Sequence, residues 1–510
     1  MAKMMDIPHS TIGRRGFIQS AGGVAAGLAL GAAGPLFAGS SRPNVLLILV
    51  DQMRQAKWTP ELKTPNVDRL AGKGVSFVNH FVSASPCSPS RSCLLTGTYT
   101  TQNRMFTNCD FVEGERQPSL DPRIPTFGHV FGQAGYQTPY RGKWHLTRKS
   151  DLNPNDPLGD YGFTGWKPPD APFGGSAYNG AIMDPIYSRQ ACRWLLDADN
   201  HRQPWFLVCS LVNPHDICEY PLYYPQRKLR PIKTDAPPPN WTDDLSGKPG
   251  AQREFQKNYE SFAGKVKLSD PDAWRRYLDY YIHCMEEVDR NLGRVLEALE
   301  HSGQAGNTII VFTADHGEMG GSHQLRTKGS FAYEEEMNVP LIFTCPGHLP
   351  EGVTVNSFAA SVDVMPTLIE LAGIRNSNYM AGVSLASLLA DPKAAGVREE
   401  VVFHQDWEMA VKIGKSPDAP TMRHPAHIRC LRGRDWKYAH YFSPYNDGVE
   451  YELYDLKNDP LEMVNLASDA GYQARKKEMH ERLMERENKL VEEFKPFAGS
   501  GPGRNADVIK

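Results

Sequence analysis

The chain has 510 residues, of which 40% are hydrophobic and 23% are charged, and its formal net charge is −3. These values are ordinary for a globular protein of two or three domains, or of one large α/β domain. No long basic run occurs in the sequence. We therefore expect no nucleic-acid partner, because phosphate backbones bind clustered Lys and Arg.

Residues 1–38 predict a segment that is removed from the mature protein. Arg14 and Arg15 precede Phe17, an apolar run rich in Ala and Gly, and the sequence Leu-Phe-Ala that ends at Ala38. This order is typical of a twin-arginine export signal, so we expect a periplasmic or secreted protein. The alternative is an N-terminal membrane anchor, although the run is short for a span of about 20 residues. No other stretch is long and apolar enough to cross a bilayer, so no stable span is expected after signal removal.

Buried strands are expected where continuous apolar runs end abruptly in polar residues. Four such runs read NVLLILVDQ, GYQTPYRGKWH, PWFLVCSLVNPHD and NTIIVFTADHGE, and VPLIFTCPG follows them. Helical stretches at 272–302 and 361–373 lie among these runs. Strand–helix alternation predicts a mostly parallel sheet covered by helices, with the ligand site beyond the carboxyl ends of the strands. The polar residues that end the four runs are therefore candidates for one site: Asp51, Lys143, His145, His215, Asp216, Asp315 and His316.

Two insertions rich in Pro, Gly and Asp interrupt this pattern, at 151–179 and 220–249. They are either a rim that shapes substrate access or ordinary surface loops.

The residue pattern of the sequence changes after about residue 395. Short antiparallel strands with aromatic alternation are expected there, followed by a charged helix over 472–494. We therefore predict a large domain over 39–395 and a smaller α+β domain over 396–510.

Cys87 and Arg91 lie in a short polar loop, SASPCSPSRSCLLTG, with Pro89 between them. A phosphatase-type thiolate loop places its Arg six positions after the Cys, whereas here the gap is four and Pro89 removes one backbone N–H. A zinc ligand would need partners nearby. A buried structural cysteine is the default for an isolated Cys.

The segment CSPSRSCLLTG resembles the signature of the type I sulfatases, Cys-x-Pro-x-Arg followed by Thr-Gly. Seven further blocks resemble family blocks in the family's order: RPNVLLILVDQMR, TPNVDRLAGKGVSFVNHFV, YRGKWHL, NPHD, TADHGE, TKGSFAYEEEMNVPLI and ELYDLKNDPLEMVNLA. The chain is therefore identified as a member of this formylglycine-dependent family, within the alkaline phosphatase superfamily. The resemblance implies an α/β fold with a large, mostly parallel sheet sandwiched by helices, and a smaller C-terminal domain.

The resemblance also implies that Cys87 is converted to Cα-formylglycine, also called 3-oxoalanine. A formylglycine-generating enzyme, or an equivalent, would recognise Pro89 and Arg91 in the unfolded chain. In the folded protein, Arg91 would be a fixed cation beside the new nucleophile.

A divalent cation is expected beside residue 87. Asp51 and Asp315 are carboxylates at separate strand ends and suit a hard cation. Gln52 could add a side-chain oxygen and His316 a nitrogen. The commonest family pattern has Asp and Asn at those two positions, and the Gln and His variants resemble the choline-sulfatase and phosphonate monoester hydrolase branch. We expect Ca²⁺, with Mg²⁺ or Mn²⁺ as alternatives because His softens an all-oxygen site.

By resemblance, the sulfate group is lined by Lys143, His145, His215 and Lys328. The aldehyde of residue 87 would be hydrated to a gem-diol, and one hydroxyl, held by the metal ion so that residue 87 is itself a metal ligand, would attack sulfur. Arg91 and the two lysines would stabilise the developing charge. His215 or Lys328 would help the alcohol depart, and His145 would take the proton of the second hydroxyl so that sulfate leaves.

The predicted activity is hydrolysis of sulfate esters, either of small molecules or of sulfated saccharides. The first alternative is a phosphonate, phosphate monoester or phosphodiester hydrolase on the same fold, which the pair of Gln52 and His316 keeps open. The second is an inactive binding protein, which would lack catalytic residues, and none of the family's is missing here.

Overall fold

The computed structural model describes residues 42–109, 117–170, 179–222, 232–375, 380–406, 424–443 and 446–492. The predicted export signal, residues 1–38, lies outside these residues. All described elements belong to one compact unit, residues 35–510. Within the described residues, every helix is too short or too polar to cross a membrane.

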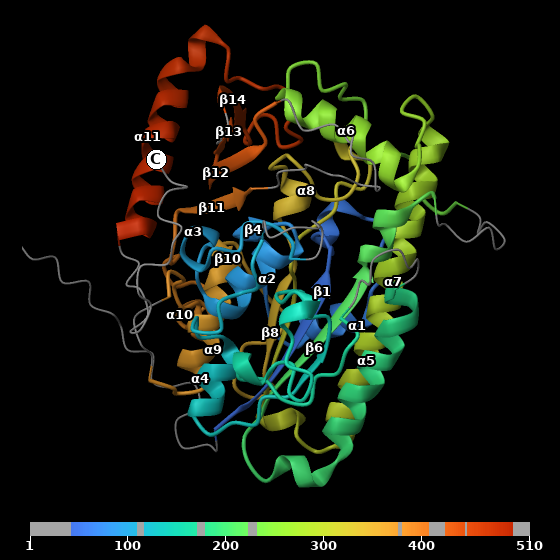
Figure 1. Cartoon of the computed structure of the whole chain (residues 1–510), viewed down its shortest axis with the longest axis vertical. Helices are drawn as coiled ribbons and strands as arrows, with labels where there is room; N and C mark the ends of the chain where they lie inside the picture. Colours follow the sequence, from blue (N-terminus) through green and yellow to red (C-terminus); the bar gives the residue numbers. More distant parts are fainter. Residues whose placement is uncertain are drawn as a thin grey trace, which may run out of the picture. The chain divides into compact units, whose positions relative to one another are not determined.

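A seven-stranded sheet lies at the centre of the larger part of the fold (Figure 1). In spatial order its strands are β5 Tyr140–Gly142, β6 Phe206–Pro214, β1 Asn44–Asp51, β7 Thr308–Ala314, β8 Leu341–Thr344, β2 Val75–Phe77 and β9 Val353–Val355. β8 runs antiparallel to both of its neighbours, and every other pair is parallel. The structure therefore confirms the predicted mostly parallel sheet.

Strand β1 shows why the sheet is buried on both faces. All eight of its residues are buried. Leu46, Ile48 and Val50 pack into one hydrophobic cluster, and the alternate residues Val45, Leu47 and Leu49 pack into another. Successive side chains of a strand point to opposite faces, so a continuous apolar run satisfies both layers.

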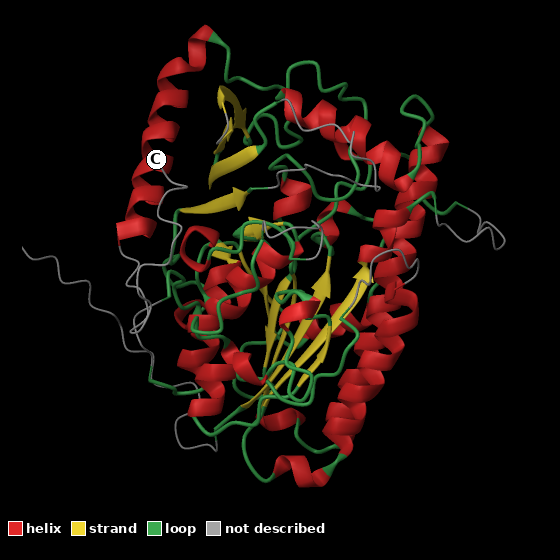
Figure 2. Ribbon diagram, in the orientation of Figure 1, coloured by secondary structure: helices red, strands yellow, loops and turns green. Residues whose placement is uncertain are grey.

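Helices cover both faces of this sheet (Figure 2). α5 Asn179–Leu196 and α7 Pro271–His301 pack on one face, and α4 Phe127–Gln133, α9 Val364–Leu371 and α10 Ala386–Ala390 pack on the other. α7 begins where the Asp270 carboxylate accepts hydrogen bonds from the backbone N–H groups of Asp272 and Ala273. Four shorter helices are α1 Pro65–Gly72, α2 Cys87–Thr96, α3 Thr100–Asn103 and α8 Glu334–Met337.

A second sheet of five strands follows in the C-terminal part. Its order is β14 Asn446–Asp455, β13 Trp436–Ser443, β12 His427–Gly433, β11 Glu400–Gln405 and β4 Ala84–Ser85. β11 to β14 are antiparallel, whereas β4 joins the edge in parallel. Helix α11 Gln473–Glu492 packs on β12 and β13, and a two-stranded pair joins β3 His80–Phe81 to β10 Ala359–Ala360.

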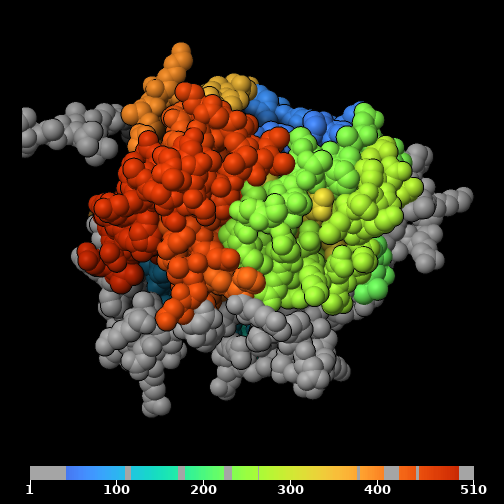
Figure 3. Space-filling model, turned by 90° about the horizontal axis from the view of Figure 1, so that it is seen from above, coloured from blue at the N-terminus to red at the C-terminus, as the bar shows by residue number. Residues whose placement is uncertain are grey.

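The second sheet also contacts α6 Gly250–Ala263. Gln252 Nε2 donates hydrogen bonds to Tyr441 Oη at 3.0 Å and to Glu452 Oε1 at 2.9 Å. Figure 3 shows the surface of the C-terminal part directly beside that of the α6–α7 region. The smaller α+β part has the predicted composition of strands and a helix, and its boundary near residue 395 stays a prediction.

Candidate active site

The candidate site lies at the carboxyl ends of four adjacent strands, β5, β6, β1 and β7. β1 ends at Asp51, and Lys143, His215 and Asp315 directly follow the other three strands. Because these strands are parallel, their carboxyl ends meet at one edge of the sheet. The structure thus brings together four buried polar side chains that are far apart in the sequence.

Helix α2 brings Cys87 and Arg91 to the same place. Cys87 is the first residue of this helix, whereas the sequence pattern predicts a loop. Pro89 is compatible with the helix because residues of the first turn need no backbone N–H for helical hydrogen bonds. Arg91 follows one turn later and therefore shares a face with Cys87. The Ser90 hydroxyl donates to the carbonyl oxygen of Asp315, which ties the helix to the end of β7.

Four ligand-capable side chains meet at this point: Asp51, Cys87, Asp315 and His316. One ligand atom from each lies within 4.8 Å of the others, and all four residues are buried. His316 Nε2 lies 3.2 Å from Cys87 Sγ. It also lies 3.6 Å from Asp51 Oδ1 and 3.7 Å from Asp315 Oδ1. Two carboxylates and an imidazole nitrogen suit a divalent cation, so the donor set fits the expected metal ion.

The surroundings of His316 favour a positive charge. Its Nδ1 lies 2.9 Å from the carbonyl oxygen of Gly317, which orients Nε2 toward the four-residue group. Burial opposes the charged imidazole, but the negative charges of Asp315 and Cys87 outweigh burial and raise the pKa of His316 to about 9. The negative groups around Nε2 therefore stabilise positive charge at this point.

Gln52 lies beside this group, in a left-handed backbone conformation with φ of 72°. Its backbone N–H donates to Asp315 Oδ1 at 3.0 Å. Its side-chain oxygen accepts a hydrogen bond from Lys328 Nζ at 2.6 Å and lies 3.0 Å from Cys218 Sγ. The structure thus brings Gln52 into the site and engages its oxygen with Lys328.

Two basic residues pair with the carboxylates. Lys143 Nζ forms an ion pair with Asp51 Oδ2. Arg91 Nε donates to Asp315 Oδ2 at 2.8 Å, and its Nη2 lies 3.4 Å from Asp51 Oδ2. Burial raises the pKa of Asp51, but the positive charges of Lys143 and Arg91 lower it well below its usual value. Asp51 therefore stays ionised at neutral pH.

The position of residue 87 stabilises negative charge. Burial and Asp51 raise the pKa of the Cys87 thiol, but Lys143, Lys328 and His316 outweigh them and lower it. Sγ of Cys87 marks the place that the oxygen of an aldehyde or its hydrate would take. Because the cause is the neighbouring positive charges, an anionic oxygen would be stabilised there as well.

Two imidazoles near residue 87 stay neutral. Burial lowers the pKa of His145 well below its usual value, and the charge of Lys143 lowers it further. Burial and the charge of Lys328 likewise lower the pKa of His215 well below its usual value. Neutral imidazoles can accept a proton. The three cations beside them, Arg91, Lys143 and Lys328, suit an anionic substrate.

The family model of the sulfatases matches residues 43–374. The chain belongs to the sulfatase family. A second model, for the C-terminal part of N-sulphoglucosamine sulphohydrolase, matches residues 321–489. As a sulfatase, the protein is a sulfuric ester hydrolase.

Known relatives agree with this assignment. The sulfatase is 29% identical over 446 residues to a Delta 4,5-hexuronate-2-O-sulfatase of Bacteroides thetaiotaomicron, with 84% of this chain and 86% of the relative covered. The solved structure of a 2-O GAG sulfatase matches with a TM-score of 0.72 at 27% identity, covering 89% of this chain and 94% of that one. The phosphonate monoester hydrolase of Agrobacterium radiobacter matches with a TM-score of 0.69 at 27% identity, covering 88% and 96%. These similarities confirm the predicted alkaline-phosphatase-like fold.

The sulfatase site also depends on a carboxylate that the sequence pattern does not single out. Asp170 accepts hydrogen bonds from the backbone N–H groups of Trp144 at 2.8 Å and His145 at 2.6 Å. His145 has φ of 59°, which a residue with a side chain adopts when its surroundings hold it there. Ser88 Oγ donates to the His145 carbonyl oxygen at 2.5 Å. Asp170 lies in the first insertion, so only the structure links it to the site.

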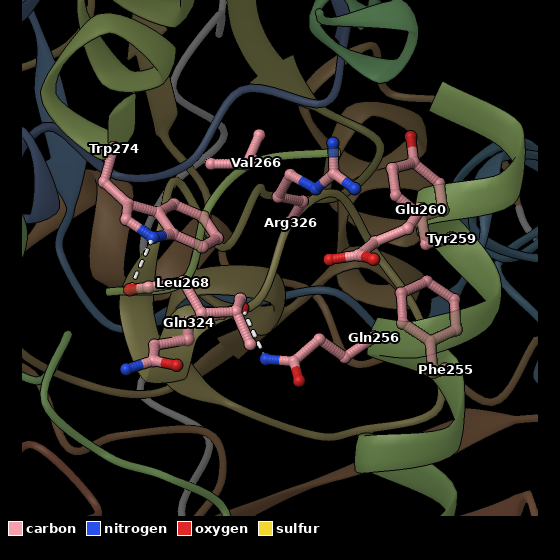
Figure 4. Close-up of a pocket in the computed structure, with 9 residues that line it drawn as sticks. All are labelled: Phe255, Gln256, Tyr259, Glu260, Val266, Leu268, Trp274, Gln324 and Arg326. Carbon is pink, nitrogen blue, oxygen red and sulfur yellow. Dashed lines mark hydrogen bonds between the residues drawn. The ribbon is translucent and has the colours of Figure 1, made fainter. Parts of the chain in front are cut away.

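A pocket beside the segment that carries Lys328 is formed by α6, the start of α7 and residues of that segment (Figure 4). Gln256 Nε2 donates to the carbonyl oxygen of Gln324 at 2.9 Å. The Arg326 guanidinium lies over the Tyr259 ring, 5.0 Å from its centroid. The pocket is separate from the candidate site residues, and its contacts fix the chain just before Lys328.

Proposed function

We propose that this sulfatase removes sulfate from sulfated carbohydrates, with residue 87 as the nucleophile. The observation that carries the proposal is the placement of Cys87 and Arg91 on one face of α2, against the carboxylates of Asp51 and Asp315. The substrate class rests on the relatives that are named a hexuronate-2-O-sulfatase and a 2-O GAG sulfatase.

Residue 87 is proposed to be Cα-formylglycine in the active protein. Its hydrated aldehyde supplies one hydroxyl that attacks sulfur and a second whose deprotonation releases sulfate. Cysteine oxidation requires a separate maturation enzyme of the formylglycine-generating type, which would act before Cys87 becomes buried.

Asp51, Asp315, His316 and residue 87 would hold a divalent cation. Gln52 is the fifth candidate ligand, and its side-chain oxygen binds Lys328. Ca²⁺ is proposed first, with Mg²⁺ or Mn²⁺ as alternatives. When bound, the cation would lower the energy of negative charge on the oxygen of residue 87 and on the sulfate.

Three basic side chains would bind the sulfate group of the substrate. Lys143 and Arg91 are fixed by Asp51 and Asp315, and Lys328 is fixed by the Gln52 side chain. Fixed cations cost little reorganisation when charge develops on the sulfate oxygens. They also favour an anionic substrate over a neutral one.

The two neutral imidazoles, His145 and His215, are proposed to act at different steps of the reaction. His145 lies in the turn after β5 and would take the proton from the second hydroxyl of residue 87. His215 begins the turn after β6, and the departing alcohol oxygen would be assisted either by a hydrogen bond from this neutral imidazole or by a proton from the Lys328 ammonium group. The low pKa of His145 keeps it ready to accept a proton at neutral pH.

A second candidate function is hydrolysis of phosphonate or phosphate esters at the same site. Gln52 and His316 favour it, because this pair resembles the phosphonate monoester hydrolase branch. The similarity to a solved phosphonate monoester hydrolase supports the same alternative.

A direct comparison of substrates tests the proposal. The mature protein is assayed with an aryl sulfate, an aryl phosphonate monoester, and a panel of sulfated uronate and hexosamine sugars, with Cys87→Ala as the blank. We expect the largest kcat/KM among the sulfate esters, with a sulfated sugar above the aryl sulfate. A larger kcat/KM for the aryl phosphonate would favour the second candidate.

Export is also proposed, on the sequence of residues 1–38 alone, which lie outside the described residues. Replacement of Arg14 and Arg15 by Lys should leave the protein in the cytoplasm, as cell fractionation would detect. Unchanged export of that variant would count against a twin-arginine route.

A further inference from the structure

Glu318 is a fully buried carboxylate beside the site, with no ion-pair partner within the described part of the chain. Its Oε1 accepts three hydrogen bonds, from Tyr277 Oη at 2.7 Å and from the backbone N–H groups of Gly320 at 3.0 Å and Thr327 at 2.6 Å. Its Oε2 accepts a hydrogen bond from Gln52 Nε2. One carboxylate thus connects the end of β1, helix α7 and the segment that carries Lys328.

The hydrogen-bond partners of Gln52 determine the orientation of its side-chain amide. Nε2 faces the Glu318 carboxylate and, at 3.2 Å, the Thr327 hydroxyl. Oε1 faces the ammonium group of Lys328 at 2.6 Å. The ammonium of Lys328 can only donate, and the Glu318 carboxylate accepts from every donor around it, so the reverse orientation of the amide would lose both hydrogen bonds.

The backbone of Glu318 is held from the other side. Arg54 Nη1 donates to the carbonyl oxygens of Glu318 at 3.2 Å and Met319 at 2.9 Å. Arg54 is itself buried, and its Nε donates to Thr59 Oγ1 at 2.8 Å. The Glu318 carboxylate therefore has a fixed position against which the Gln52 amide is set.

We infer that Glu318 is a positioning residue, which acts through Gln52. It holds the Gln52 amide with the oxygen toward Lys328, and it fixes the backbone at Thr327, next to Lys328. Glu318 touches neither the sulfate nor residue 87 in this scheme. The inference rests on the proposed function for its effect on catalysis, but not for the contact itself.

An exchange of donor and acceptor tests the inference, with Glu318→Gln, Gln52→Glu and the double variant. In Glu318→Gln, an amide N–H₂ faces the N–H₂ of Gln52, or else faces the three donors at Oε1. In Gln52→Glu, two carboxylates face each other. In the double variant, the amide introduced at position 318 donates to the carboxylate introduced at position 52, while the amide oxygen still accepts the other three hydrogen bonds. The carboxylate at position 52 still offers an oxygen to Lys328.

We expect each single change to lower kcat/KM for an aryl sulfate about 10- to 100-fold, as expected for a buried polar group left without its partner. The double variant should lose clearly less than the product of the two single losses, because it restores the contact in exchanged form. A double variant whose loss equals the product of the two single losses would overturn the inference.

Tyr277→Phe is the matched control, because it removes one hydrogen bond to Glu318 Oε1 and leaves the Gln52 contact in place. It should lower the thermal unfolding midpoint but keep kcat/KM within about threefold. If Tyr277→Phe lost as much activity as Glu318→Gln, Glu318 would have only a structural role, and the inference would be wrong.

Thermal unfolding of the unchanged protein, the two single variants and the double variant, measured without substrate, separates this inference from the proposed function. If the unchanged protein hydrolysed no sulfate ester, the proposed function would fail. Recovery of the unfolding midpoint in the double variant would still support the contact between Glu318 and Gln52, and additive losses would still overturn it.

Discussion

Residue 87 combines two properties that a buried cysteine rarely has together. It lies at the first turn of α2, and the charges of Lys143, Lys328 and His316 lower the pKa of its thiol. Cys93 lies in the same helix, but burial raises the pKa of its thiol to about 12. The two cysteines of one signature are thus in opposite electrostatic surroundings, and only the first is suited to carry negative charge.

Replacement of Cys87 by Ala should abolish turnover of sulfate esters, because no other side chain at that place can supply the nucleophile. Cys93→Ala is the control and should keep kcat while costing about 1–2 kcal/mol of unfolding free energy. Steady-state kinetics and denaturant unfolding of both variants check this. Appreciable turnover by Cys87→Ala would contradict the assigned role.

The two imidazoles predict the acidic limb of the pH profile. Burial and nearby cations lower the pKa values of His145 and His215 below the usual value of about 6.5. Their neutral forms therefore persist as the pH falls through 6.5, and kcat/KM should decline only at lower pH. A pH–rate profile from pH 4 to 9 measures this, and an acidic midpoint at or above about 6.5 would contradict it.

At the scale of elements, short turns after the strands set the site. The turn after β5 carries Lys143 and His145, and Asp170 fixes it through two backbone N–H groups. Trp166 Nε1 also donates to the carbonyl oxygen of Gly142 at 2.7 Å. The sequence leaves open whether the first insertion is a rim of the site or an ordinary surface loop. In the structure, Trp166 and Asp170 of this insertion bind the end of β5 and the turn that follows it.

Asp170→Ala should lower kcat about tenfold or more, because two buried N–H groups lose their acceptor and the His145 turn loosens. The thermal unfolding midpoint should fall as well. Asp160→Ala in the same insertion is the control, since its side chain is exposed, and should change neither quantity. Equal effects of the two changes would show that Asp170 does not position the turn.

At the scale of the whole molecule, the C-terminal sheet holds the segment that carries Lys328. Arg432 of β12 binds Glu334 of α8 through two hydrogen bonds, at 3.1 Å and 3.0 Å. Lys437 of β13 donates to the carbonyl oxygen of Ala332 at 2.5 Å. The smaller sheet thus contributes to the site without supplying any of the candidate site residues.

Arg432→Met should lower the free energy of unfolding at pH 7 by about 3 kcal/mol, because Glu334 would stay buried without its bidentate partner. Burial raises the pKa of Glu334, but Arg432 and Lys437 lower it to about 2. The pair's stabilisation is therefore fully present above about 4.3, the usual pKa of Glu, and is lost as the pH falls toward 2.

The difference in unfolding free energy between the unchanged protein and Arg432→Met should accordingly shrink below about pH 4.3. The double variant Glu334→Gln, Arg432→Met is the control and should recover part of the loss. Denaturant unfolding at several pH values measures both effects, and a difference that grows with acidity would contradict the assignment.

The sequence predicted the sheet and most of the residues that the structure brings together at the candidate site, because apolar runs that end in polar residues carry both kinds of information. Asp51, His215 and Asp315 follow from this pattern, and Cys87 and Arg91 follow from the signature. The start of α2 at Cys87, the α6 helix and strands β4 and β11 did not follow, because they depend on partners elsewhere in the chain.

Positioning residues were the hardest to predict. Asp170 and Glu318 bind backbone N–H groups or an amide, and neither interaction leaves a spacing signal. For Gln52, the sequence predicted a place in the site but not the hydrogen bond between its oxygen and Lys328.

The central claim is that residue 87, oxidised to an aldehyde, carries the hydrolysis of sulfate esters. Intact-peptide mass spectrometry of residue 87, on preparations of differing specific activity toward an aryl sulfate, tests it most directly. We expect the peptide to be lighter than its cysteine form, and the fraction of aldehyde to rise in proportion to specific activity. Full activity in a preparation whose residue 87 is entirely cysteine would contradict the claim.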